Sequence, residues 1–131
     1  MSNKNKNQTG GNVMSNGSND NAILDQTQTI GKGRRVCIWN KALTEAGLGA
    51  GTRITVTAFG NLGVLAVAAD PEGKRKVSRV MNHGAELPVI DLKENKSLGF
   101  SFLGEPGYKV RVRVYAAAGE SSPASVMVTR V

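Results

Sequence analysis

Short stretches of alternating apolar and polar residues run through the chain from residue 35 onward, and such alternation is typical of β-strands. In residues 108–115 the pattern is clearest, because valines at 110, 112 and 114 alternate with charged residues. Glycine and proline separate the stretches from one another. The pattern predicts strands at 35–39, 52–59, 64–68, 87–92, 108–115 and 125–131. We therefore expect a mainly β protein.

One short helix is predicted over residues 40–46. Asn40 is a residue type that caps helix starts, and Leu43 and Ala46 are spaced so that both can face a core. Gly47 follows directly and is suited to end the helix.

Residues 1–31 differ from the rest, since they consist mostly of Asn, Gln, Ser, Thr and Gly. Such a segment buries too little apolar surface to offset the entropy lost on ordering. We expect a disordered polar tail, in which residues 22–24 and Ile30 are able to pack locally or to pair with a partner chain. Residues 32–131 form the expected folded domain.

The domain contains an internal repeat of about 55 residues. Gly51-Thr52-Arg53-Ile54 matches Gly107-Tyr108-Lys109-Val110 in residue type and in its place before a strand. The two similar halves span about 33–69 and 86–131, joined by a basic linker. If the similarity is not a chance likeness of β-hairpins, each half completes the other. The expected fold is a small pseudo-duplicated β-barrel with one or two short helices.

Charge narrows the choice of partner. The chain has 131 residues, enough for one domain, and a formal net charge of +7. The tail is neutral, so the whole excess lies on residues 32–131. A basic domain favours polyanions such as DNA, RNA, an anionic membrane surface or an acidic protein. A protein that is merely basic is the plain alternative.

The cations fall into three groups, each of which is either a phosphate-binding surface or a solvated face. Alternation places the three cations of strand 108–115 on one side. The linker holds a second group, and the residues around the first strand and helix hold a third. The candidate nucleic-acid-binding residues are Lys32, Arg34, Arg35, Lys41, Arg53, Lys74, Arg75, Lys76, Arg79, Lys109, Arg111 and Arg113.

A family resemblance rests on the residues from Gly31 to Ile54. Gly33-Arg34 precedes the first strand, and Ile38, Gly47, Leu48, Gly51 and Ile54 follow at fixed spacing. This pattern resembles the AbrB/MazE/SpoVT swapped-hairpin family. It departs from that family at Trp39, where proline is usual, and at Leu43, one place off. The second half matches only in outline. The resemblance implies an intertwined, DNA-binding β unit, with a homodimer left open.

The sequence contains no clear set of catalytic or metal-binding residues. Cys37 and His83 are the single cysteine and histidine, too few for a zinc site, and the acids are scattered near turns. Cys37 lies in an apolar run and is expected to be buried, and His83 to lie in a solvated loop. We expect no catalytic residues, cofactor or metal.

The expected function is non-enzymatic DNA binding, by a transcription-regulator or antitoxin-like protein. Six aromatic residues are few for single-strand stacking, which favours duplex DNA. The alternatives are a structural or assembly protein, such as a virion component, and an RNA-binding β-barrel. No apolar run approaches the length of a membrane span, and no signal peptide is visible. We therefore expect no membrane partner and a cytoplasmic location.

Overall fold

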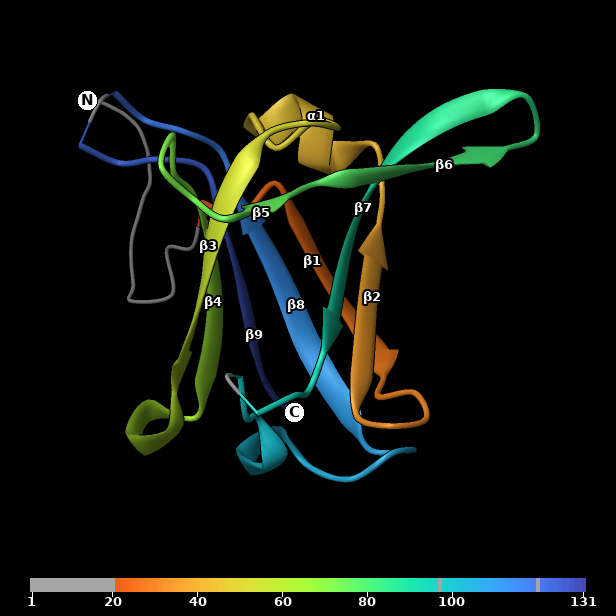
Figure 1. The fold of residues 1–131 in the computed structure, drawn as a ribbon, viewed down its shortest axis with the longest axis vertical. Helices are drawn as coiled ribbons and strands as arrows, with labels where there is room; N and C mark the ends of the chain where they lie inside the picture. Colours follow the sequence, from red (N-terminus) through yellow and green to blue (C-terminus); the bar gives the residue numbers. More distant parts are fainter. Residues whose placement is uncertain (1–20, 97, 120) are drawn as a thin grey trace, which may run out of the picture.

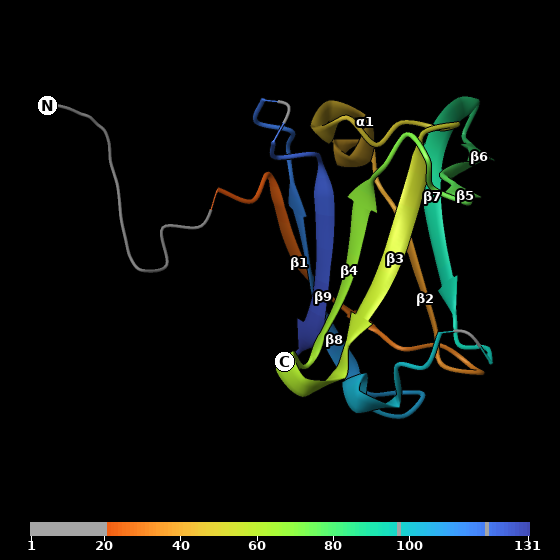
Figure 2. The ribbon, with the colours of Figure 1, turned by 60° about the vertical axis from the view of Figure 1, so that its left-hand side comes forward.

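Two antiparallel β-sheets face each other across one core in the computed structural model, which describes residues 21–96, 98–119 and 121–131 (Figure 1). The larger sheet contains, in spatial order, β1 (Leu24–Thr29), β8 (Lys109–Tyr115), β9 (Ser125–Arg130), β4 (Val64–Ala69), β3 (Arg53–Phe59) and β5 (Arg75–Lys76). The smaller sheet contains β2 (Arg35–Trp39), β7 (Ala85–Lys93) and β6 (Ser78–Asn82). Figure 2 shows the two layers from the side. The predicted mainly β class is confirmed.

The core lies between the sheets and takes every second residue of the long strands. In β8 the three valines are fully buried, while Lys109 and Arg111 are exposed on the other side. In β3, Ile54 faces the core and Arg53 faces solvent. Burying these aliphatic side chains supplies the main stabilising free energy. The two faces of both strands are those that the alternation predicts.

In the larger sheet each predicted half contributes one hairpin, and the two hairpins lie side by side at the centre, flanked by β1 on one side and β5 on the other. Hairpin β3–β4 meets hairpin β8–β9 through the antiparallel β4–β9 pair, with Ala66 opposite Met127. In the smaller sheet, β2 pairs antiparallel with β7, with Cys37 opposite Asp91. These pairs join corresponding strands of the two predicted halves, β4 with β9 and β2 with β7. Such an order is expected of two similar halves.

Each half also closes one end of the core. Helix α1 (Ala42–Ala46) lies at one end, and the 3-10 turn η2 (Ser101–Leu103) lies at the other. Leu43 of α1 and Leu103 of η2 are both fully buried. A second 3-10 turn, η1 (Gly60–Leu62), joins β3 to β4.

The predicted helix ends as expected but begins later. Asn40 precedes it, and its Oδ1 accepts a hydrogen bond from the Ala42 amide at 2.8 Å. Helix α1 starts at Ala42, and Gly47 ends it with a φ of 107°, in the left-handed region that glycine adopts most readily.

Strands β1, β5 and β6 were not predicted. Strand β1 pairs with β8 along its whole length, which corrects the expected boundary of the polar tail at residue 31. Its alternation is hard to recognise because Gln26 and Gln28 occupy half-buried positions where apolar residues are usual. Residues 1–20 of the expected tail lie outside the described residues.

The expected linker is also structured. Strand β5 pairs with β3 in the larger sheet, and β6 pairs with β7 in the smaller one. Val77, which is buried, joins them, so that one extended segment passes from the first sheet to the second.

A buried glycine positions the start of this segment. A methyl group at Gly73 would come within 2.6 Å of the carbonyl carbon of Ile54, and that backbone belongs to β3. We expect Gly73→Ala to lower the free energy of unfolding by about 1–3 kcal/mol, the usual cost of overpacking. Urea denaturation measures this change.

Gly99→Ala is the matched control. Its added methyl group would meet nothing closer than the Glu94 side chain at 3.9 Å. We expect a change within about 0.5 kcal/mol. Equal effects of the two substitutions would contradict the close approach of Gly73 to β3.

Candidate nucleic-acid interface

The candidate residues around the first strand and helix do not form one cluster. Arg34 and Arg35 lie at the start of β2, whereas Lys41 lies beyond its other end, just before α1. Arg53 is in β3, in the other sheet, where its register partner is Lys76 of β5. The cations predicted around the first strand and helix are therefore spread over both sheets. Arg53 lies beside the cations of the predicted linker instead.

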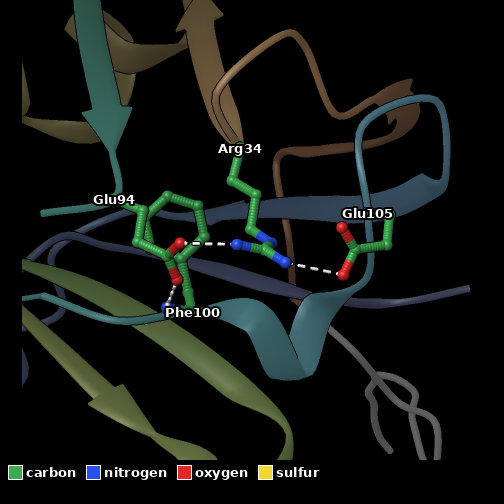
Figure 3. Close-up of polar contacts among 4 residues, drawn as sticks. All are labelled: Arg34, Glu94, Phe100 and Glu105. Atoms are coloured by element: carbon green, nitrogen blue, oxygen red, sulfur yellow. Dashed lines mark hydrogen bonds and ion pairs between the residues drawn. The ribbon is translucent and has the colours of Figure 1, made fainter.

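Arg34 forms ion pairs with Glu94 and Glu105, and we call this set of contacts the Arg34 clasp (Figure 3). Its Nη1 donates to Glu94 Oε1 at 2.9 Å and its Nη2 to Glu105 Oε2 at 2.6 Å. The second oxygen of Glu94 accepts a hydrogen bond from the Phe100 amide at 2.9 Å. Arg34 thus ties the turn before β2 to the loop around η2, and its φ of 55° is held in the left-handed region. Its charge is compensated within the protein.

Three more candidate arginines have carboxylate partners. Arg35 Nε donates to Asp91 at 2.8 Å, and Arg79 lies 3.2 Å from Glu86. Arg111 makes two hydrogen bonds to Asp25, at 2.9 and 2.6 Å. Arg113 lies opposite the same aspartate in the β1–β8 register.

These pairs lie at the surface and contribute little to stability individually, but they reduce the positive potential around each arginine. The basic side of β8 is therefore partly neutralised by β1. Sequence reasoning missed this compensation because it did not place β1 in the sheet, and Asp25 is the residue that reveals it.

The cations next to β5 are arranged differently. Lys76 stands directly opposite Arg53, so that both side chains point to the outer side of the larger sheet. Lys74, which is exposed, lies two residues before Lys76, in the bend that leads into β5. We call these residues, Arg53, Lys74 and Lys76, the β3–β5 patch. Within the described part of the chain, no carboxylate lies within salt-bridge distance of any of them.

One hydrogen bond positions the patch: Arg53 Nη1 donates to the Gly73 carbonyl at 3.0 Å, which fixes the guanidinium beside the start of β5. Arg75 lies on the opposite side of β5, near Asp91. The pKa of Asp91 is lowered mainly by its hydrogen bond from Arg35, and the charge of Arg75 adds to this effect. Arg75 is therefore separate from the patch.

Two acids border the patch. Asp70 accepts hydrogen bonds from the Thr55 hydroxyl at 2.7 Å and from the Glu72 amide at 2.9 Å. These bonds lower the pKa of Asp70 and keep it ionised. Its carboxylate is thereby held by the 70–73 turn. Glu72 itself is exposed in that turn.

The remaining candidates are single cations. Lys32 and Lys41 are exposed, at opposite ends of β2. Lys109 lies near the Thr29 hydroxyl, at 3.5 Å, and its place in β8 corresponds to that of Arg53 in β3. Arg53 and Lys109 thus lie on the same outer face, at corresponding places of the two predicted halves.

The described residues include few side chains that suit catalysis or metal binding. His83 lies in the exposed two-residue turn between β6 and β7, with φ of 51°. Cys37 is half-buried rather than buried, and this desolvation raises the pKa of its thiol. Among the described residues, no three His, Cys, Asp or Glu side chains gather in a way that suits a metal ion. None of the described helices is long and apolar enough to cross a membrane.

Comparisons with protein-family models, with curated proteins and with solved structures found no match to this chain. The resemblance to the AbrB-like family therefore stays a prediction from residues 31–54.

The Arg34 clasp leads to a pH-dependent prediction. The Phe100 amide and then Arg34 lower the pKa of Glu94 below its ordinary value of 4.5. A carboxyl with a depressed pKa stabilises the fold above its ordinary pKa, and this contribution is lost as the pH falls through the folded-state value. We expect Glu94→Gln to be less stable than the wild type at neutral pH and to lose less stability on acidification. Urea unfolding at neutral and acidic pH measures both.

Glu86→Gln is the control, since it removes the same charge from an exposed pair on β7. We expect its unfolding curve at neutral pH to stay close to that of the wild type. If Glu94→Gln and the wild type lost stability equally on acidification, the clasp would not act as described.

Proposed function

We propose that the chain is a non-enzymatic DNA-binding protein that grips duplex phosphates with the β3–β5 patch. The observation that carries this proposal is that the patch brings together three cations without a carboxylate partner, whereas the candidates Lys32, Lys41 and Lys109 lie apart from one another. Four candidate arginines are paired with carboxylates, while Arg53, Lys74 and Lys76 have no such partner in the described chain. Neighbouring cations that form no ion pair within the protein are available for phosphate contacts.

The shape of the surface favours an extended ligand. Lys76 and Arg53 are neighbours across the β3–β5 pair, and Lys109 lies on the same face at the far end of β8. Counting strands and residues along the sheet, Arg53 and Lys109 are separated by roughly 30 Å. Arg111 and Arg113 lie between them along β8 and are partly exposed. A ligand that contacts both ends carries several phosphates, as a nucleic acid does.

We also propose that the protein acts as a transcription regulator or antitoxin. The AbrB-like resemblance implies a regulator or antitoxin that binds DNA through a basic surface made by both copies of a β unit. Here two similar halves within one chain would supply that surface, which supports the proposal. The Arg34 clasp differs from what the resemblance implies, because Arg34, a predicted DNA-binding residue, has two carboxylate partners within the protein. A cytoplasmic location is part of the proposal, since DNA is the proposed partner.

The test is the salt dependence of duplex binding. Each phosphate contact adds about 0.9 to the slope of log affinity against log salt concentration. We expect Lys74→Ala with Lys76→Ala to weaken binding uniformly across sequences and to lower the slope by about 2. Fluorescence anisotropy with a random-sequence duplex, at several salt concentrations, measures both quantities.

Lys93→Ala with Lys96→Ala is the matched control, because it removes the same charge from exposed positions outside the patch. We expect a clearly smaller change in slope. Equal losses in both double variants would point to net charge alone and would contradict a defined patch. Competition with duplex RNA separates DNA binding from the RNA-binding alternative.

A further inference from the structure

The end of hairpin β6–β7 projects from the body of the protein (Figure 1). We call residues 78–88 the β6–β7 arm. Ser78 to Met81 are all exposed, although Val80 and Met81 are apolar, with exposed fractions of 40% and 65%. An isolated two-stranded hairpin is only marginally stable in water. Exposed apolar side chains on such a hairpin are typical of a surface that contacts another molecule.

The arm also ends in an unpaired edge. Strand β6 pairs with β7 on one side, and it is the last strand of the smaller sheet in the part of the chain that the structure describes. Its peptide groups on the other side face outward. Soluble proteins usually protect such edges with charged residues, prolines or bulges. Strand β6 carries one such residue, Arg79, whose charge is paired with Glu86 of β7, while Val80 and Met81 beside it leave the centre of the edge apolar.

Charge makes the arm suitable for contact between identical chains. It contains one cation, Arg79, and one acid, Glu86, which pair with each other at 3.2 Å. Counted in the same way as the net charge of +7 for the whole chain, the arm has a formal net charge of zero. Two copies repel each other least at this site, and a polyanion gains little there.

We infer that two copies of this chain associate by antiparallel pairing of their β6 strands, centred on Val80. This register places Arg79 opposite the partner's Met81, and Ser78 opposite the partner's Asn82, so that no like charges are directly opposed. The contact is isologous, as a twofold dimer requires.

The register also joins apolar side chains across the interface. Val80 stands opposite Leu87 within each arm, on the outer face of the smaller sheet. In the dimer, a continuous row would run from Leu87 through Val80 to the partner's Val80 and the partner's Leu87. Apolar cross-strand pairs of this kind stabilise a sheet. This inference does not depend on DNA binding, because the β3–β5 patch lies on the other sheet.

The experiment measures the mass of the full chain by light scattering after size exclusion, from micromolar to sub-millimolar concentration. We expect the wild type to reach twice the chain mass of 13.8 kDa. Val80→Lys and Val80→Glu each place like charges at the centre of the interface, and each is expected to stay monomeric. An equimolar mixture of the two is expected to recover the dimer, because the charges then attract.

Leu62→Lys is the control, since it adds the same charge at a side chain that is 74% exposed and lies in η1, away from the arm. Circular dichroism verifies that all variants keep the β fold. A wild type that stays monomeric throughout would overturn the inference. So would a dimer that Val80→Lys leaves intact, or a mixture of the Lys and Glu variants that does not associate.

Discussion

The whole arrangement depends on pairing between the two halves, through β4 with β9 in one sheet and β2 with β7 in the other. Neither half has enough strands to enclose a core. When the halves pair, the valines of β8 and the aliphatic residues of β2 and β7 are removed from water together. The helix of one half and the 3-10 turn of the other then cover opposite ends. Local structure in each half is therefore stabilised by contacts with residues distant in sequence.

Surface charge follows from the same geometry. Sheet pairing brings Asp25 beside Arg111, and the loop around η2 brings two glutamates to Arg34. These contacts use part of the positive charge to hold strands and turns in place. Several other cations also lack a carboxylate partner among the described residues, and three of them lie together along the β3–β5 edge. The distribution of ion partners, rather than the total charge, thus distinguishes one basic surface from another.

Much of the fold was predictable from alternation, because the long strands bury one side and expose the other. Strand β2 and the faces of β3 and β8 follow the expected pattern. Strand β1 was missed because its inward positions include glutamines, and β5 was missed because its two residues, Arg75 and Lys76, are both cations and too few to show alternation. The candidate site was harder to predict. Pairing between Arg53 and Lys76 depends on register, and pairing between Arg34 and Glu105 spans 71 residues.

Joining both halves in one polypeptide has a consequence for how their surfaces can differ. In an assembly of two identical subunits, every substitution appears twice, and both sides must stay alike. Here Lys76 stands beside Arg53 of the first half, while Thr29 stands beside Lys109 at the corresponding place of the second half. Two halves linked in one chain are released from that constraint, so that the strand beside β3 can carry a cation where the strand beside β8 carries an uncharged residue.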